Sequence, residues 1–460
     1  MTGSTGDTST PAPTLLTAPW RDPVTVLAAF ADEPFALCLL SDGEGERGRW
    51  SYLARAPARI LVIDPADPRD PFAELSGLIG PARDLAARGP PFQGGVMGLA
   101  AYELGDRIER LGLARRPCWP DLACARYDTL LAFDHHRREV VAVGPEPAAA
   151  RAARAWLGGP SPPPFRPGPL AAAVIAPPPA DHEAIVADVT ARIAAGEIFQ
   201  ANVARAWTGA LLAGRRPFDL FARLAAASPA PFAAYLRLPG LAVVSNAPER
   251  FLRVTPTAAG LVAETRPIKG TIPRGHTPSE DAALAAALAA SPKDRAENLM
   301  IVDLMRNDLS RVAVTGGVEV PELFAVERFA NVSHLVSAVT ARLAPGRTAV
   351  DLLAAAFPPG SITGAPKVQA MKVIAAAEPP RGPFFGSMFW AGVDDAFDSS
   401  VLIRTTALDE DADGAWRFEA RAGGGVVADS DPAAERAETD AKIAAILSAL
   451  TSPAGNRACA

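Results

Sequence analysis

Apolar residues in the first third of the chain occur in short runs that glycine- and aspartate-rich breaks separate. Typical runs are 35–40, 59–63 and 130–133, which are rich in Leu, Ile, Val and Phe. The residues between them are those that favour turns. This pattern predicts a strand-rich N-terminal region from 15 to 143.

The remaining sequence divides into one long region and three low-complexity stretches. Residues 1–14 are rich in Thr, Ser and Pro and are expected to be disordered, and 451–460 is expected to form a tail. Residues 144–180 are dense in proline, which predicts a linker or surface excursion with one short helix at 148–157. The second folded region is therefore expected to span 181–450.

The second region mixes helical and strand patterns. Ile185, Val189 and Ile193 recur every fourth residue, so 181–195 is predicted to be a helix. Further helices are predicted at 292–307, 366–377 and 432–450. Strands are predicted at 200–207, at 241–244 paired with 251–254 around a turn, at 399–408 and at 416–422.

Composition excludes several classes of protein. The chain has 460 residues, a net charge of −6 and no basic patch with interleaved aromatics, so nucleic acid is not an expected partner. The N-terminus lacks a secretory signal, and no apolar run reaches the length of a membrane span. The four cysteines form no CxxC pattern, which favours reduced thiols in a cytoplasmic protein.

Lys269 is the most informative single residue. It lies between Ile268 and Gly270, with Pro267 and Pro273 restricting the backbone on either side. A lysine held in this way can be a desolvated amine with a lowered pKa, able to act as a nucleophile. The alternative interpretation is a solvated loop lysine.

Two predicted helices carry acidic residues at the same spacing. Asp294 and Glu297 lie three apart on one helix, and Glu435 and Glu438 lie three apart on the other, followed by Lys442. Side chains at this spacing share one helix face, and two such faces brought together would suit Mg²⁺. The alternative is ordinary surface pairing and compensation of the helix dipole.

Three further features predict sites for anions. The glycines Gly423, Gly424 and Gly425 follow a strand and would let backbone N–H groups approach a carboxylate, although a tight turn explains them equally. Segment 361–367 is predicted to open a helix whose free N–H groups bind an anion or are simply capped. Arg404 in the apolar run 401–405 predicts either a buried partner or a bound carboxylate.

Read together, these motifs resemble the chorismate-utilising enzymes, which include anthranilate, aminodeoxychorismate, isochorismate and salicylate synthases. The resemblance implies an α+β fold in which a two-sheet antiparallel β sandwich is flanked by helices. A weaker match covers 39–42 and 94–98. The motifs that carry the resemblance, in family order, are 197–202, 247–251, 267–271, 297–312, 332–335, 360–367, 401–405 and 422–442.

The resemblance implies roles for the residues named above. Glu249 is expected to be the general acid, and Lys269 the nucleophile. Glu297 and Glu438 are expected to bind Mg²⁺ directly, with Asp294 and Glu435 nearby. The residues expected to bind substrate are His334, Ser361, Thr363, Trp390, Arg404, Gly423, Gly424, Gly425 and Lys442.

Two positions distinguish the branches of the family. Lys269 together with Gln200 resembles the aminodeoxychorismate synthases, because anthranilate synthases usually have alanine at the first position and isochorismate synthases have lysine at the second. The substrates are then chorismate and ammonia, and the ammonia comes from solution or, as the resemblance implies, from a separate glutamine amidotransferase subunit. The alternatives are an anthranilate synthase and a noncatalytic chorismate- or tryptophan-sensing subunit.

Three residues depart from the family pattern. Ala247 stands where serine is usual, and Phe389-Trp390 stands where Gly-Tyr is common. Because the tyrosine position lies near the substrate in relatives, Trp390 is expected to change the local contacts or to pack in its place.

Overall fold

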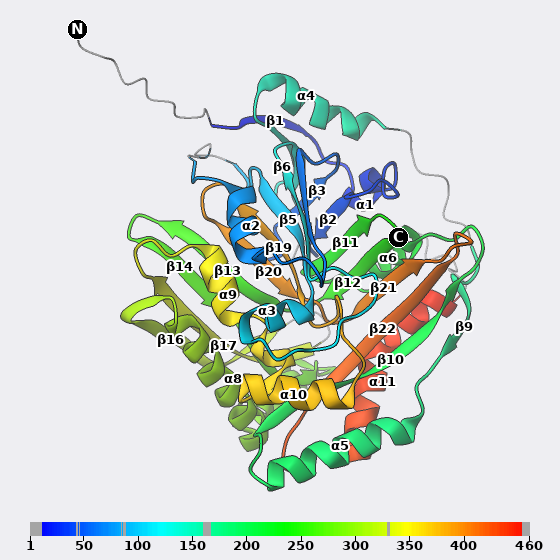
Figure 1. Cartoon of the computed structure of the whole chain (residues 1–460), viewed down its shortest axis with the longest axis vertical. Helices are drawn as coiled ribbons and strands as arrows, with labels where there is room; N and C mark the ends of the chain where they lie inside the picture. Colours follow the sequence, from blue (N-terminus) through cyan, green and yellow to red (C-terminus); the bar gives the residue numbers. More distant parts are fainter. Residues whose placement is uncertain are drawn as a thin grey trace.

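The computed structural model describes residues 12–42, 45, 47–83, 85, 89–159, 167–328 and 332–452. Within these ranges the strands form a 12-stranded sheet and a 10-stranded sheet, and neighbouring strands are antiparallel. Figure 1 shows the two sheets with helices around them. The predicted α+β fold with two antiparallel sheets is confirmed.

The first sheet combines strands from both ends of the chain. It therefore joins the two sequence regions into one structural unit. In spatial order its strands are β1 (Thr14–Pro19), β8 (Glu139–Gly144), β7 (Leu130–Asp134), β3 (Trp50–Ala54), β2 (Leu37–Leu40), β11 (Phe232–Leu238), β12 (Leu241–Ala247), β21 (Thr405–Glu410), β22 (Trp416–Val426), β10 (Gln200–Leu211) and β18 (Gly364–Ala365), with β9 (Ala171–Ile175) also paired to β10.

The second sheet is mixed in the same way. Strands from the N-terminal region form one end, and strands from the second region form the rest. In spatial order they are β15 (Ile268–Pro273), β17 (Val332–Leu343), β14 (Gly260–Thr265), β13 (Arg250–Thr257), β20 (Phe397–Val401), β19 (Ser387–Gly392), β5 (Gly95–Ala100), β6 (Leu122–Tyr127) and β4 (Arg59–Ile63), with β16 (Ala313–Arg328) also paired to β17.

The helices connect these strands and cover the sheets. Short 3₁₀ turns occur at Tyr102–Leu104, Trp156–Gly158 and Gly360–Ile362. The α-helices are α1 (Pro23–Leu27), α2 (Pro71–Ile79), α3 (Gly105–Glu109), α4 (Pro147–Ala155), α5 (Pro179–Ala194), α6 (Pro217–Ala227), α7 (Pro278–Ala290), α8 (Pro292–Ser310), α9 (Ala349–Ala356), α10 (Lys367–Ala377) and α11 (Pro432–Thr451).

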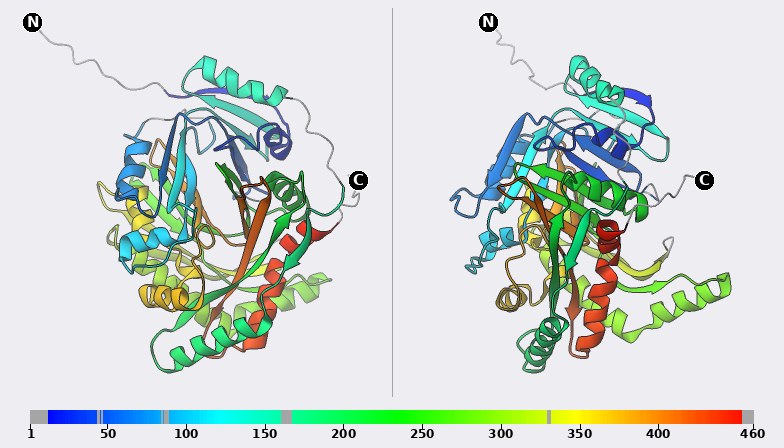
Figure 2. Two further views of the ribbon diagram at one scale, coloured as in Figure 1. Left: turned by 45° about the vertical axis from the view of Figure 1, so that its right-hand side comes forward. Right: turned by 90° about the vertical axis from the view of Figure 1, so that its right-hand side faces the viewer.

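The first sheet is buried on both faces. Along β12, Val243 belongs to the core between the two sheets, whereas Val244 belongs to the core under α6 and α11. This alternation follows from the two-residue period of a strand. Figure 2 shows α11 (red) lying along β22 and β10, where its Ile443 enters the second core. The sheet therefore holds α11 in a fixed position relative to the inter-sheet space.

Two predicted strand arrangements are wrong, and both errors concern points where the chain passes from one sheet to the other. The stretches 241–244 and 251–254 do not pair, because β12 lies in the first sheet and β13 in the second. The predicted strand 399–408 is two strands, β20 and β21, separated at Arg404, whose backbone is left-handed with φ 49°. Sequence pattern within a strand carries no information about which sheet it joins.

The two crossings are hydrogen-bonded to each other. The amide of Val401 donates to the carbonyl of Glu249 at 3.1 Å, and the amide of Asn246 donates to the carbonyl of Arg404 at 3.0 Å. Two segments about 155 residues apart in sequence are thereby brought side by side. This contact places the predicted general acid next to the predicted carboxylate-binding arginine.

The predicted helices at 292–307 and 432–450 are confirmed as α8 and α11. Each has proline at its first position and a capping side chain before it. Ser291 Oγ accepts from the amide of Asp294, and Asp431 Oδ1 accepts from the amide of Ala434 at 2.8 Å. These caps satisfy orphan N–H groups and set where each acidic pair begins.

The proline-dense stretch 144–180 is more than a connection. It contains α4, close to the predicted helix at 148–157, and β9, which pairs with β10 at the edge of the first sheet. Of the predicted disordered 1–14 and tail 451–460, residues 1–11 and 453–460 lie outside the described part of the chain. None of the helices in the described ranges has the length and apolarity to cross a bilayer.

Candidate active site

A cavity of about 670 Å³ lies where α8, α11, β15 and the two sheet crossings meet. We refer to it as the Lys269 cavity. Most of the predicted site residues line it, although they come from segments spread over almost two hundred residues. They are Glu249, Lys269, Asp294, Glu297, His334, Ser361, Arg404, Gly423, Gly425, Glu435, Glu438 and Lys442.

A break in strand pairing positions Lys269. In β15, Ile268 pairs with Val336 and Thr271 pairs with His334, and the register shifts between them. Gly270 lies in this bulge with φ +87°, a conformation that favours glycine. A Cβ on Gly270 would stand 2.9 Å from Asp294 Oδ1, so the bulge also lets the strand approach α8. Bulges of this kind redirect a side chain.

The surroundings of Lys269 favour the neutral amine. Its side chain is partly buried and lines the cavity. Burial lowers the pKa of Lys269 and Lys442 adds to this effect, whereas the carboxylates of Glu297 and Glu249 act in the opposite direction. A lowered amine pKa increases the fraction of lysine that carries a free electron pair.

The pKa of Glu249 is shifted in the opposite direction to that of Lys269, as a general acid requires. Burial raises the pKa of its carboxyl group, and a hydrogen bond from Ser361 and the charge of Lys269 oppose that rise only in part. Its side chain lies in the crossing from β12 to β13 and lines the cavity. A carboxyl group with a raised pKa retains its proton to higher pH and can donate it.

The acidic pairs of α8 and α11 face the same cavity from two sides. Burial raises the pKa of Glu297, and the negative charges of Asp294 and Glu435 act in the same direction, against Lys269 and Lys293. Glu435 accepts a hydrogen bond from Ser430 Oγ at 2.7 Å. The two helices therefore bring their carboxylates close enough to repel each other.

These carboxylates fit a divalent cation by their chemistry. They are hard oxygen donors, and their mutual repulsion would be relieved by a positive charge between them. Within the described residues, no three His, Cys, Asp or Glu side chains converge into a ready-made metal site. The Mg²⁺ site stays a prediction.

His334 and Arg404 also line the cavity. The Nδ1 atom of His334 is 2.8 Å from Thr271 Oγ1. Burial, together with the charge of Arg404, lowers the pKa of His334 to about 4. The imidazole is therefore neutral near pH 7 and can accept or donate a single hydrogen bond toward the cavity.

Trp390 is not in the Lys269 cavity. It lines a second cavity of about 490 Å³, where its ring centroid is 5.2 Å from that of Phe92 and 6.1 Å from that of Tyr52. The expectation that Trp390 contacts the substrate is therefore wrong for this structure. Packing against two neighbouring rings holds it on the other side of β19.

Thr363 and Gly424 also lie outside the cavity lining. Thr363 is fully buried, and its hydroxyl donates to the carbonyls of Pro359 and Gly360. The segment 361–367 forms a 3₁₀ turn and β18 before α10 begins, so its hydroxyls do not cap that helix. Gly424 faces α11, where a Cβ would stand 2.8 Å from Glu435 Oε2. Alternation along β22 leaves Gly423 and Gly425 toward the cavity.

Several residues without a predicted site role also line the cavity, among them Lys293, Thr271, Asn202 and the charged Arg421. Lys293 lies four residues before Glu297, a spacing that places both on one face of α8 and could have revealed it. Asn202 lies two residues after Gln200 in β10, so both point to the same face of the strand. Nothing in the sequence distinguished Thr271 from its neighbours.

The buried amide of Gln200 lies close to the Lys269 amine. Gln200 is fully buried, and neither of its amide atoms has a hydrogen-bond partner within the described residues; the same holds for Asn202 Oδ1. A Cβ on Gly425 would stand 2.5 Å from Gln200 Nε2 and 3.2 Å from Lys269 Nζ. The absence of a side chain at Gly425 therefore lets the amide and the amine converge.

The chain matches known proteins over nearly its whole length. The family described as chorismate binding enzyme matches residues 36–448. The chain is 39% identical to aminodeoxychorismate synthase component 1 of Klebsiella aerogenes, over 96% of this chain and 100% of that protein. It is 38% identical to anthranilate synthase component 1 of Streptomyces coelicolor, over 93% of this chain and 87% of that protein.

Solved structures agree with the fold. The anthranilate synthase component I from Streptococcus pneumoniae TIGR4 superposes with a TM-score of 0.76 at 27% identity, covering 88% of this chain and 93% of that one. The motifs that suggested the resemblance line the Lys269 cavity, and the family match covers all of them. This chain belongs to the family of chorismate-binding enzymes.

Proposed function

We propose that this chain is the component of an aminodeoxychorismate synthase that aminates chorismate at C4. The observation that carries the proposal is a lysine amine with a lowered pKa, Lys269, in a cavity that also contains a carboxyl group with a raised pKa, Glu249. Opposite shifts of this kind give one group the role of nucleophile and the other the role of acid. The relative from Klebsiella aerogenes carries the corresponding name.

In the first step, the neutral amine of Lys269 forms a bond to ring C2. The two conjugated double bonds shift, the C4–O bond breaks, and the hydroxyl leaves as water after taking the proton of Glu249. Hydroxide is a poor leaving group, so the proton supplied by Glu249 lowers the barrier. The product of this step is a covalent adduct between the ring and Lys269.

In the second step, ammonia forms a bond to C4 and the double bonds shift back. The C2–N bond breaks, its electron pair returns to Lys269, and the proton that ammonia loses returns to the Glu249 carboxylate. The enzyme is regenerated, and the ring carries an amino group where the hydroxyl stood. Dividing the substitution into two allylic steps replaces one difficult displacement by two easier ones.

Four carboxylates would hold the cofactor, Mg²⁺. Glu297 and Glu438 would be direct ligands, with Asp294 and Glu435 beside them. When bound there, Mg²⁺ would neutralise the ring carboxylate and help the C4 oxygen to leave. Lys442 donates to the carbonyl of Gly423 at 2.8 Å and pairs with Glu438 at 2.6 Å, so it links α11 to the glycine strand.

Substrate carboxylates would bind on the side of the cavity opposite α8. Arg404 offers a planar pair of N–H donors at the second sheet crossing. The backbone of Gly423 and Gly425 borders the cavity without side chains. Neutral His334 lines the cavity from the strand that pairs with β15, and it would contact the ring without adding charge.

Ammonia would come from a separate glutamine amidotransferase subunit. The curated relatives are named as component 1, which implies a second component for them. The buried amide of Gln200 lies close to Lys269 and that of Asn202 borders the same cavity, so their oxygens would accept hydrogen bonds from ammonia.

Anthranilate synthase is the second candidate. The relative from Streptomyces coelicolor is 38% identical and is named anthranilate synthase component 1. Family resemblance favours the first candidate because anthranilate synthases usually lack a lysine at position 269. A noncatalytic sensing subunit is a weaker alternative, since a pure binder has no use for an acid and a nucleophile with opposite pKa shifts.

The test is to identify the product made from chorismate, Mg²⁺ and ammonium, with and without an aminodeoxychorismate lyase. We expect 4-aminobenzoate only when the lyase is present. Fluorescent anthranilate in the absence of the lyase would assign the second candidate. Unchanged chorismate under all conditions, in a folded protein, would favour the sensing subunit.

A further inference from the structure

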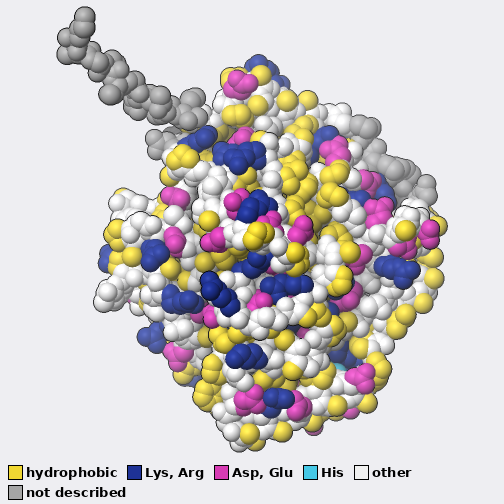
Figure 3. Space-filling view, in the orientation of Figure 1, with side chains coloured by type: hydrophobic (Ala, Val, Ile, Leu, Met, Phe, Trp, Pro, Cys, Tyr) yellow, Lys and Arg dark blue, Asp and Glu magenta, His cyan; other side chains and the backbone are white. Residues whose placement is uncertain are grey.

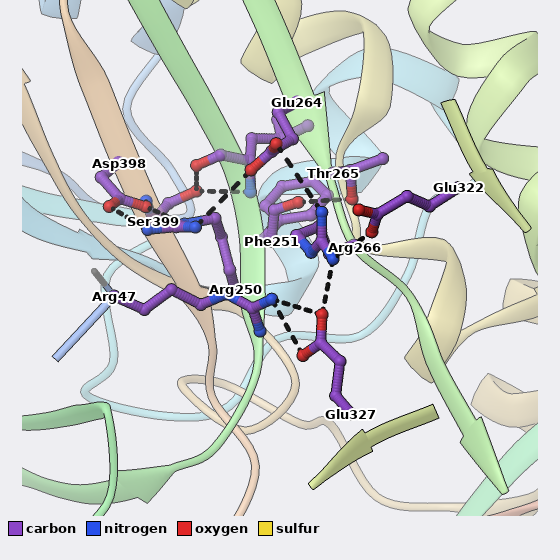
Figure 4. A network of polar contacts seen from close by, with 11 residues as sticks. Arg47, Arg250, Phe251, Glu264, Thr265, Arg266, Glu322, Glu327, Asp398 and Ser399 are labelled. Atoms are coloured by element: carbon purple, nitrogen blue, oxygen red, sulfur yellow. Dashed lines mark hydrogen bonds and ion pairs between the residues drawn. The ribbon is translucent and has the colours of Figure 1, made fainter. Parts of the chain in front are cut away.

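A network of charged side chains connects the N-terminal region to the strand that carries Lys269. Figure 4 shows it, with Arg47, Arg266 and Glu327 at its centre. Arg47 Nη2 donates to both carboxylate oxygens of Glu327 at 2.7 and 2.9 Å. Arg266 Nη2 donates to Glu327 at 2.5 Å and to Glu322 at 2.6 Å. Glu327 is thus held between two guanidinium groups.

The backbone around Lys269 is irregular. Arg266 and Pro267 lie in the gap between β14 and β15, where no strand pairing among the described residues includes them, and Lys269 and Gly270 lie in the bulge. The contacts that hold this segment include the Ile268–Val336 pairing, a bond from the amide of Ser337 to the carbonyl of Pro267, and the approach of Gly270 to Asp294 on α8. The side chain of Arg266 adds a further tether upstream of the bulge.

Glu327 reaches both flanks of the Lys269 bulge. On the upstream side it binds Arg266, three residues before Lys269. On the downstream side it lies opposite His334 in the β16–β17 pairing, where its negative charge acts on the imidazole, and that ring contacts Thr271, two residues after Lys269. Glu327 itself does not line the Lys269 cavity.

Glu327 is ionised in this setting. Burial acts to raise its pKa, but the hydrogen bonds from Arg47 and Arg266 outweigh that effect and the pKa is lowered. Charge-assisted hydrogen bonds are shorter and stronger than neutral ones, so they resist displacement. The carboxylate therefore links Arg47 of the N-terminal region to Arg266, which precedes the Lys269 strand.

We propose that Glu327 is a positioning residue that sets where the Lys269 amine stands in the cavity, acting through Arg266 on one side and His334 on the other. The inference rests on the proposed function of Lys269 as nucleophile. It adds that the N-terminal region, through Arg47, contributes to the placement of a group that belongs to the second region. Displacement of a reacting group by about 1 Å can lower a rate by about a hundredfold.

The test compares Glu327→Gln with a matched control, Glu410→Gln. Glu410 pairs with Arg237 at 3.1 Å, and its side-chain exposure of 34% and that of its partner, 13%, resemble the 21% and 14% of Glu327 and Arg266. We expect Glu327→Gln to lower kcat about 10- to 100-fold while the KM for chorismate changes less than about threefold. Glu410→Gln should change neither value.

Arg47→Ala is the second variant, and it tests the proposal even if Glu327→Gln does not fold. It removes the outer guanidinium and leaves the Glu327–Arg266 pair, so kcat should fall about two- to fivefold. The proposal is overturned if Glu327→Gln folds and keeps kcat within about twofold, if it changes only KM, or if Glu410→Gln loses as much. A full-rate Arg47→Ala beside an unfolded Glu327→Gln also overturns it.

The outcome is separable from that of the proposed function. If the wild-type protein makes anthranilate, the proposed function fails while chorismate consumption still reports on Glu327. If the product is aminodeoxychorismate and the Glu327 variants are fully active, the proposed function stands and only the positioning role fails.

Discussion

Helices α8 and α11 carry the same acidic pattern and present it to the same cavity, yet the two pairs differ in electrostatic state. Glu297 on α8 is partly buried, and its pKa is raised by burial with Asp294 and Glu435 adding to the effect. Glu438 on α11 is about half exposed and pairs with Lys442 at 2.6 Å. Burial would raise its pKa, but Lys442 outweighs this and the pKa is lowered.

The difference arises from what each helix faces. Helix α8 packs beside β15, whose bulge brings Gly270 against Asp294, whereas α11 lies along β22 and carries its own lysine one turn after Glu438. Spacing of three residues predicts a shared helix face but says nothing about burial or countercharge. Glu297 can therefore take up a cation or a proton, whereas the charge of Glu438 is already balanced by Lys442.

The surface outside the cavity is less organised. On the face drawn in Figure 3, Lys and Arg side chains are interspersed with Asp and Glu. Surface ion pairs such as those of Arg69 with Asp67 and Glu74 join exposed or partly exposed groups. Pairs of this kind contribute little to stability, so the electrostatics that matter for function are concentrated between α8 and α11.

The largest expected effect follows from removing the positively charged side chain of Lys269, which acts on the carboxylates of both helices. Lys269→Ala should fold normally and reduce aminodeoxychorismate formation about a thousandfold or more, because no nucleophile remains. Lys269 is the first charge acting on Glu297 but follows Lys442 for Glu438, so the pKa of Glu297 should rise more. Product formation at saturating ammonium is the measurement, and wild-type rates in the variant would disprove the covalent role.

The next largest effect concerns the affinity for Mg²⁺. Glu297→Gln and Glu438→Gln should each weaken Mg²⁺ binding about a hundredfold, since each removes a predicted direct ligand. Isothermal titration with Mg²⁺ in the absence of chorismate measures this without relying on activity. Glu410→Gln again serves as control. Unchanged affinity in either variant would remove that glutamate from the ligand set.

The two helices can also be compared through the glycines that approach them, Gly270 beside α8 and Gly424 beside α11. Gly270→Ala places a Cβ 2.9 Å from Asp294 Oδ1 and 3.0 Å from its Cβ, at φ +87°, so it should destabilise the fold by about 1–3 kcal/mol. Gly424→Ala meets only the flexible end of Glu435, at 2.8 Å, and should cost less than about 1 kcal/mol. Denaturant unfolding of both variants gives the ranking, and equal losses would contradict it.

The smallest effect is in the pH dependence of stability. Because the pKa of Glu297 is raised, this group lowers the free energy of unfolding at high pH. The loss is absent below the ordinary pKa of 4.5 and grows as pH rises toward the folded-state pKa. Because the pKa of Glu438 is lowered, this group adds to the free energy of unfolding. The gain is present above pH 4.5 and is lost as pH falls through the folded-state pKa.

Without metal, Glu297→Gln should therefore be more stable than the wild type at pH 7, and Glu438→Gln less stable. Both shifts should be under about 1 kcal/mol because the groups are partly exposed. Between pH 7 and pH 4 the Glu297 shift should shrink toward zero, whereas the Glu438 shift is lost only as the pH falls through its lowered folded-state pKa. Thermal unfolding at the two pH values is sufficient. Shifts of the same sign at pH 7 would show that the two helices are electrostatically equivalent.

Much of the site was predictable from local sequence. Caps and spacing predicted α8 and α11, and the prolines around Lys269 marked a constrained lysine that the structure places in the cavity. Family motifs added Glu249, His334, Ser361 and Arg404, all of which line it. Each of these signals is carried by residues close together in the chain.

The failures have a common cause, which is that strand partners lie far apart in sequence. The break at Arg404 and the separation of β12 from β13 follow from which sheet each strand joins. Trp390 was assigned to the substrate by its position in a motif, but packing against Tyr52 and Phe92 holds it in the other cavity. Thr363 was assigned by its hydroxyl, which two backbone carbonyls already accept from.

The sequence by itself determined the helices with their acidic faces, the constrained lysine and the family to which the motifs belong, because helix periodicity, capping and proline restriction are local. Only the tertiary structure decided that Glu249 and Arg404 stand side by side and that the pKa values of Glu297 and Glu438 shift in opposite directions. Those properties depend on burial and on nonlocal strand pairing, which no single segment encodes.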